Sequence, residues 1–294
     1  MNEADKPLTF NDLLELVAID PKRVIALRHR PSERKLRRVL PWLAAEHAEV
    51  FNAYQQTQRP TVEKAFLTVD HVAAFIGQEP GRATFVGLYR RDGQEPITPQ
   101  DFRAKPAVRR LIELGLVPNN RRDTMYWFDL QPSANLAEYS GRLIIDWPGG
   151  ERTWWRRSER NRFKVLAIAE RDALNIDVPH WNEVVLNWAE LRTLPQSWRL
   201  AFQQWRAIYY IFDTHSRKGY VGSAYGERNL MQRRQEYAET GHGGDVELKP
   251  LNAQNFRFSI LQLLAPDLPM DEVVRVESNW KSRLHTREFG LNRT

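Results

Sequence analysis

Two tyrosine-bearing apolar runs, separated by a short polar segment, limit the fold of this chain more than any other feature. Residues 206–214 have the composition of a β-strand, and a second such run starts at 219 and ends at 224 with Gly-Ser-Ala. The residues between them, 215–218, are polar and suit a tight turn. Two strand-like runs joined in this way predict a β-hairpin.

The residues after the hairpin predict a helix, a strand and a second helix. Residues 226–241 are helical in composition, and Arg233 and Tyr237 are one turn apart, so they share a helix face. Residues 256–264 form a strand-like run. The last helix is expected at 270–289, with an apolar stripe of Val273, Val276, Trp280 and Leu284. Glu277 lies beside that stripe, and a carboxylate near an apolar face needs a cationic partner or a metal.

The hairpin and the three elements after it resemble the GIY-YIG nuclease family over about residues 205–294. The family's Gly-Ile-Tyr is matched by Ala207-Ile208-Tyr209, and its Tyr-Ile-Gly is matched by Tyr220-Val221-Gly222. The resemblance implies an α+β domain in which helices flank a small antiparallel sheet. One departure is Ala207, which stands where the family has glycine. If that position needed a positive φ or a close backbone approach, alanine would strain the hairpin and impair a nuclease.

Further residues match the family in order along the chain. Arg233 takes the place of an arginine on the helix after the second motif, and Tyr237 follows it by one turn. Glu277 takes the place of the metal-binding glutamate, and Asn292 that of an asparagine near the domain end.

The resemblance implies hydrolysis of a DNA phosphodiester with one divalent metal, Mg²⁺ or Mn²⁺, held by Glu277. Tyr209 is the candidate general base, and we expect a nearby cation, Lys218, to lower its pKa from about 10. Tyr220 would orient the water or bind a phosphate oxygen, and Arg233 would clamp the non-bridging oxygens. Secondary roles toward phosphate or metal-bound water fall to Tyr237 and Asn292. His242 is a further candidate, although a loop histidine more often faces solvent.

Length and composition set the outer limits. The 294 residues predict about two domains, and a formal net charge of +6 with a pI of about 9.6 favours an acidic partner such as nucleic acid. The absence of cysteine excludes disulfides, thiolate nucleophiles and cysteine-ligated zinc, which fits a reducing compartment. We see neither an apolar leader nor an apolar run long enough to span a membrane, so we expect a cytoplasmic protein.

The region before the hairpin divides into three segments that differ in composition and in the period of their apolar residues. Residues 1–64 are expected to be a basic helical segment, helical over 8–56, because apolar residues recur there with a helical period. Residues 65–178 predict a mixed α+β domain, barrel-like in one interpretation, with strands at 65–69, 83–91, 124–130, 141–147 and 163–169. Residues 179–205 predict a helical linker, and 206–294 the nuclease-like domain.

Two basic stretches of this region are candidate DNA contacts. One alternates cations with rings, as a nucleic-acid groove requires, although an exposed β-ribbon would look the same; its residues are Arg152, Trp154, Trp155, Arg156 and Arg157. The other lies on a predicted helix and is either a solvated face or a phosphate-contacting surface; its residues are Arg34, Lys35, Arg37 and Arg38.

The preferred functional hypothesis is a DNA endonuclease acting in restriction or genome defence, with residues 65–178 reading a sequence or a modified base. The competing hypotheses are a non-catalytic DNA-binding or regulatory protein, which Ala207 favours, and an RNA-directed nuclease. Because one such site is expected per chain, cutting both strands of a duplex requires a homodimer on DNA or two successive nicks.

Overall fold

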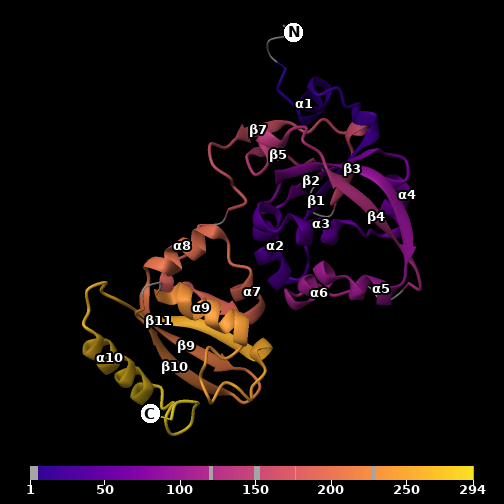
Figure 1. Cartoon of the computed structure of the whole chain (residues 1–294). Coiled ribbons are helices and arrows are strands. Elements are labelled where there is room, and N and C mark those ends of the chain that lie inside the picture. Colours follow the sequence, from indigo (N-terminus) through magenta and orange to yellow (C-terminus); the bar gives the residue numbers. More distant parts are fainter. Residues whose placement is uncertain (1–5, 119–121, 149–152, 176, 227–228, 294) are drawn as a thin grey trace. The chain divides into compact units, whose positions relative to one another are not determined.

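The computed structural model describes all residues except 1–5, 119–121, 149–152, 176, 227–228 and 294. The chain forms two compact units, Met1–Ile176 and Asp177–Thr294 (Figure 1). The basic segment expected at 1–64 is part of the first unit. The helical linker expected at 179–205 was wrong in part: this stretch belongs to the second unit, and besides two helices it contains a strand at 185–187 that pairs with the strand at 256–264. No helix among the described residues is long and apolar enough to cross a membrane.

The first unit is an α+β fold built on one mixed sheet in the order β6-β1-β2-β3-β5-β7, with β4 also paired to β3. The strands β1 and β2 are parallel, and every other strand pair of this sheet is antiparallel. The strands are β1 (Val24–His29), β2 (His71–Ile76), β3 (Arg82–Ile97), β4 (Met125–Pro132), β5 (Leu143–Asp146), β6 (Trp155–Arg157) and β7 (Val165–Ile168).

Capping residues and prolines in the sequence mark where several helices of this unit begin. Thr9 caps α1 and Thr98 caps α5 through reciprocal bonds with an aspartate three residues on, and α4, α5 and α6 each begin with proline. Their bounds are α1 (Phe10–Leu16), α2 (Arg34–Glu46), α3 (Ala48–Gln55), α4 (Pro60–Phe66), α5 (Pro99–Ala104) and α6 (Pro106–Glu113).

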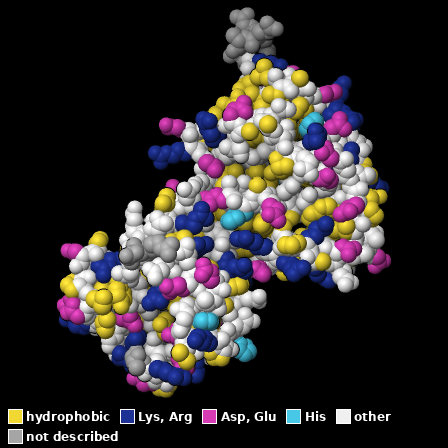
Figure 2. Space-filling model, viewed as in Figure 1, with side chains coloured by type: hydrophobic (Ala, Val, Ile, Leu, Met, Phe, Trp, Pro, Cys, Tyr) yellow, Lys and Arg dark blue, Asp and Glu magenta, His cyan; other side chains and the backbone are white. Residues whose placement is uncertain are grey.

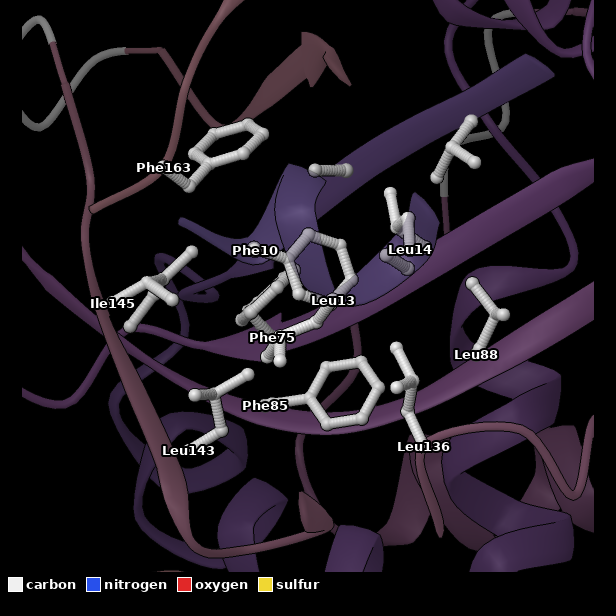
Figure 3. Close-up of a cluster of buried hydrophobic side chains, with 14 of the residues drawn as sticks. Phe10, Leu13, Leu14, Phe75, Phe85, Leu88, Leu136, Leu143, Ile145 and Phe163 are labelled. Atoms are coloured by element: carbon white, nitrogen blue, oxygen red, sulfur yellow. The ribbon is translucent and has the colours of Figure 1, made fainter. Parts of the chain in front are cut away.

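The core of the first unit lies where the curled sheet meets α1. Phe10 from α1 packs edge-on against Phe75 of β2, and Phe85 of β3 completes the group (Figure 3). Strand β5 adds Leu143 and Ile145 to the same cluster. The opposite face of β1 is also covered, since His29 contacts the rings of Phe51 and Tyr54 on α3. All residues of β1 are therefore buried.

Two expectations about this unit were wrong. The region expected to be helical over 8–56 contains the strand β1, and the strand expected at 65–69 is the end of helix α4 and the turn after it. Both segments are short apolar runs, too short for periodicity to separate a strand from a helix, and β1 is in addition buried throughout.

An ion pair with a buried carboxylate links α4 to the segment before β4. The Arg122 guanidinium donates to both carboxylate oxygens of Glu63 at 2.8 Å, and the Tyr126 amide donates to the same carboxylate at 3.2 Å. Glu63 is only 5% exposed. The Arg122 guanidinium therefore neutralises the buried Glu63 carboxylate, and replacing either residue would leave the other without its charged partner.

We expect Glu63→Gln to lower the free energy of unfolding by about 2 kcal/mol, because the half-buried Arg122 guanidinium loses its charged partner in a bidentate pair. Glu79→Gln is the matched control: it breaks an exposed pair with Arg82, so we expect less than about 0.5 kcal/mol. Urea unfolding followed by tryptophan fluorescence measures both. Equal shifts of the two transitions would show that the Glu63 pair does not fasten this unit.

The second unit is a four-stranded antiparallel sheet in the order β10-β9-β11-β8. The strands are β8 (Val185–Asn187), β9 (Arg206–Asp213), β10 (Lys218–Ala224) and β11 (Phe256–Leu264), and the helices are α7 (Trp188–Arg192), α8 (Gln196–Gln204), α9 (Asn229–Thr240) and α10 (Met270–Arg283). Figure 1 shows α10 on one side of this sheet and α9 on the other. The hairpin, the strand at 256–264 and both later helices are confirmed, although α10 ends before the expected 289.

The hairpin turn is closed by the side chain of Asp213. Its carboxylate accepts the backbone N–H groups of His215 at 3.2 Å and Ser216 at 3.0 Å, and Arg217 adopts a left-handed φ of 60°. Such an aspartate turn fixes the register of β9 with β10. That register decides which tyrosines share a face of the sheet.

Candidate active site

Tyr209 and Tyr220 lie on the same face of the β9–β10 hairpin. In the register, Gly222 pairs with Tyr209 and Tyr220 pairs with Ile211, so the two tyrosines are diagonal neighbours. Their ring centroids are 6.5 Å apart. The hairpin therefore places two phenols side by side, as the sequence predicts.

Gly222 is required by the packing of these rings. A methyl group at Gly222 would lie 2.5 Å from both Cζ and Oη of Tyr209 and 2.9 Å from Cε1 of Tyr220. The tyrosine rings cross directly over the Gly222 backbone. This glycine is thus used for close approach rather than for an unusual backbone conformation.

Ala207 shows no backbone reason for strain in the hairpin. It lies inside β9, paired with Ala224, and it is not among the described residues with a positive φ. Its methyl group is fully buried. An alanine is therefore compatible with the extended conformation of this strand.

Helix α9 brings Arg233 and Tyr237 against Tyr209. The hydroxyls of Tyr209 and Tyr237 are 3.1 Å apart, and their rings meet edge to face with centroids 6.0 Å apart. Arg233 donates through Nη1 to Glu236 at 2.8 Å, and its side chain remains 41% exposed. Arg233 acts on Tyr209 through its charge and Tyr237 through its hydroxyl, as expected of two residues on one helix face.

The environment of Tyr209 keeps its phenol protonated. Burial raises the pKa of Tyr209 to about 12, although the charge of Arg233 and the hydrogen bond with Tyr237 act to lower it. The expected net lowering of this pKa is therefore wrong, because desolvation outweighs the cation.

The cation beside Tyr209 is also a different residue from the one expected. Lys218 is exposed, and in the register of the hairpin it lies opposite Asp213. Asp213 is four residues along β9 from Tyr209, a distance of about 13 Å between their backbones. The Arg233 guanidinium is the charge that lowers the Tyr209 pKa.

The loop after α9 adds a carboxylate that the sequence did not indicate. Burial raises the pKa of Tyr220, and the charge of Asp245 and a side-chain hydrogen bond to it raise this pKa further. His242, in the same loop, is half-buried, and its Nδ1 accepts the Gly244 amide at 3.0 Å. Asp245 follows a glycine-rich segment with no periodic signal, so only the folded loop reveals its position.

Glu277 projects from α10 toward the edge strand β10. The Ser223 hydroxyl donates to its Oε2, and the Lys281 ammonium lies 2.8 Å from its Oε1. Ser223 belongs to the opposite face of β10 from Tyr220 and Gly222, because neighbouring strand residues alternate. The Glu277 charge nevertheless contributes to raising the pKa of both Tyr209 and Tyr220, after burial as the main cause.

Asn292 has a positioning role in the structure. Its Oδ1 accepts the Val221 amide, and its Nδ2 donates to the Val221 carbonyl, each at 2.9 Å. Leu291 likewise donates its amide to the Gly219 carbonyl at 2.8 Å. The C-terminal segment therefore fixes the outer edge of β10, the strand that carries Tyr220.

The metal-binding capacity of this site is limited to few protein ligands. No cluster of three or more His, Asp or Glu side chains suited to a metal occurs among the described residues. Glu277 is a single carboxylate, set on α10 beside β10. A hard divalent cation that retains several waters is compatible with one such ligand, whereas a metal that needs a closed protein cage is not.

Comparisons with known proteins give one weak similarity. No protein-family model and no curated protein matches the chain. A solved structure of a mutant of the catalytic domain of intron endonuclease I-TevI is similar at 25% sequence identity and a TM-score of 0.26, over 31% of this chain and 94% of that one. A TM-score this low does not establish a shared fold, so the function has to be argued from the site itself.

The candidate DNA contacts of the first unit differ in exposure. Arg34, Lys35, Arg37 and Arg38 are exposed on α2. Arg156 and Arg157 are half-buried on β6, where they donate to Asn161 at 2.8 Å and Thr68 at 2.7 Å. Trp154 and Trp155 are half-buried at the same sheet edge, and Arg152 lies outside the described residues. In Figure 2, Lys and Arg side chains are interspersed with Asp and Glu on the visible face of each unit.

Proposed function

We propose that the chain is a metal-dependent DNA endonuclease with a GIY-YIG catalytic unit at residues 177–294. One observation carries this proposal. The hairpin and α9 bring Tyr209, Tyr220, Arg233 and Tyr237 together, and α10 sets Glu277 against Ser223 of the same hairpin, although these residues are distant in sequence. Structural aromatic residues and surface ion pairs alone would not require this combination of phenols, guanidinium and carboxylate.

The chain's own residues divide the work of phosphodiester hydrolysis. Tyr209 orients the attacking water and removes its proton as the phenolate, and Tyr237 holds the Tyr209 hydroxyl in place. Tyr220 binds the water or a phosphate oxygen. The planar guanidinium of Arg233, still 41% exposed, stabilises the charge that develops on the non-bridging oxygens.

The metal would be held by Glu277 together with waters and substrate oxygens, and Mg²⁺ or Mn²⁺ suits that ligand set. When bound, it supplies positive charge for the phosphate and for the leaving 3′-oxygen. The Ser223 hydroxyl orients the Glu277 carboxylate by donating a hydrogen bond to its Oε2.

We assign target selection to the first unit and a role in restriction or genome defence to the whole protein. Exposed cations on α2 suit phosphate contacts, which position a protein on DNA without reading its sequence. The net charge of +6 supports a nucleic-acid partner. A homodimer on DNA would supply the second site that a double-strand break needs.

The test compares cleavage of duplex DNA, single-stranded DNA and RNA by the full chain, each with Mg²⁺, Mn²⁺ or EDTA. We expect metal-dependent cleavage of duplex DNA. Cleavage of RNA alone would replace the proposal by an RNA-directed nuclease. Tight DNA binding without cleavage of modified or unmodified DNA in any metal would replace it by a non-catalytic DNA-binding protein.

We expect Gly222→Ala to lower the cleavage rate about a hundredfold, because the new methyl group must displace the Tyr209 ring. Ala207→Gly is the control in the same hairpin: it leaves the ring in place and costs only about 0.5–1 kcal/mol of stability. Single-turnover cleavage of a duplex by folded protein measures both. A Gly222→Ala rate within a few fold of that of Ala207→Gly would exclude the tight packing described for this glycine.

A further inference from the structure

Both carboxylate oxygens of Glu277 already have partners on the chain. Oε2 accepts the Ser223 hydroxyl, and Oε1 lies 2.8 Å from the Lys281 ammonium. Lys281 follows Glu277 by one turn of α10, and a glutamate with a lysine four residues later is the favoured orientation for an ion pair on a helix. The helix itself therefore holds the ammonium at this oxygen.

The pair is shielded from water more than an ordinary surface pair. The side chains of Lys281 and Glu277 are 13% and 17% exposed, and Ser223 is 7% exposed. Charges in such a setting interact more strongly than exposed charges, because the local dielectric constant is lower. The other salt bridges of α9 and α10, Arg233–Glu236 and Arg275–Glu272, have side chains at least 34% exposed.

An ammonium and a divalent cation compete for the same carboxylate oxygen. We infer that Lys281 is a positioning residue that occupies the cation's place on Glu277 in the metal-free protein and is displaced when the metal binds. Ser223 keeps its bond to the other oxygen throughout, so the carboxylate does not turn away from the site. This inference rests on the proposed function, because it takes Glu277 as the metal ligand.

Displacement gives Lys281 a second use. In this inference the displaced ammonium pairs with a phosphate oxygen of the substrate, so phosphate and metal both act to separate Lys281 from Glu277. Lys281 thereby lowers the affinity for metal in free protein and prevents Glu277 from standing as an uncompensated, partly buried charge.

The experiment measures binding of Mn²⁺ to DNA-free protein by electron paramagnetic resonance. The proteins are the wild type, Lys281→Met, Arg275→Met and Glu277→Gln. Arg275→Met removes the same charge from the same helix at a 75% exposed position, so it controls for net charge. Lys281→Gln serves as a second variant if Lys281→Met fails to fold by circular dichroism.

We expect Lys281→Met to bind Mn²⁺ about tenfold more tightly than Arg275→Met, since the competing ammonium is gone. Glu277→Gln should lose the site. Equal or weaker Mn²⁺ binding by Lys281→Met, with the site still lost in Glu277→Gln, overturns the inference and leaves the proposed function intact. Wild-type Mn²⁺ affinity in Glu277→Gln overturns both, because the carboxylate would then not be the ligand.

Discussion

Replacing Arg233 with alanine should lower the rate of DNA cleavage about a thousandfold, because the charge that forms on the phosphate loses its planar donor. Arg233→Lys should recover little of this loss, since an ammonium keeps the charge without the bidentate geometry. The guanidinium also opposes the rise of the Tyr209 pKa, so its removal acts on the base as well. Single-turnover rates with Mn²⁺ at saturating protein measure the effect.

Arg234 provides the matched control for this prediction. It is the next residue on α9 and carries the same charge, but its Nε donates to the Leu191 carbonyl at 2.7 Å. Arg234→Ala should therefore affect stability, while folded protein keeps its cleavage rate within about threefold. Equal rate losses in the two variants would mean that Arg233 contributes only general positive charge.

Tyr209→Phe should also lower the cleavage rate about a thousandfold, because a general base contributes on that order. The pH profile gives the sharper test. Burial raises the pKa of Tyr209 to about 12, so the phenol is protonated at neutral pH and its phenolate fraction increases as the pH rises. The wild-type rate should therefore rise roughly tenfold per pH unit between about pH 7 and pH 9.

Tyr210→Phe is the control for this profile, because Tyr210 lies on the opposite face of β9 and stacks on Phe212. It should keep both the rate and the slope, whereas Tyr209→Phe should show a much smaller slope. A wild-type profile that is level over this range would rule out Tyr209 as the base that must ionise.

The second unit could be predicted well from the sequence because its signals are local. The polar turn after Asp213 and the strand-like composition of β9 and β10 define the hairpin, helical composition defines α9, and an apolar stripe with a helical period defines α10. The first unit was harder to predict. Strand β1 is buried on both faces, so its apolar run shows no alternation, and only its pairing with β2 and β6 makes it a strand.

The residues of the candidate site could be predicted where a local sequence motif on a single strand or helix identifies them. Tyr209, Tyr220, Arg233 and Glu277 each follow from a motif on its own strand or helix. The partners of these residues come from tertiary structure instead. Ser223 and Lys281 meet at Glu277 only because α10 packs on β10, and Asp245 reaches Tyr220 from an irregular loop. The Tyr209 pKa is raised rather than lowered because the side chain is buried, and the spacing of residues in the sequence does not predict that burial.

The most direct test of the central proposal is the rate of plasmid cleavage in Mn²⁺ by the wild type and by Glu277→Gln, with EDTA as the reference. Glutamine keeps the shape of the side chain and can still accept a hydrogen bond from Ser223, but it lacks the charge that would hold the metal. We expect the wild type to cut only with metal and Glu277→Gln to cut no faster than the EDTA reference. Equal metal-dependent rates for the two proteins, or no cutting by the wild type, would contradict a nuclease centred on Glu277.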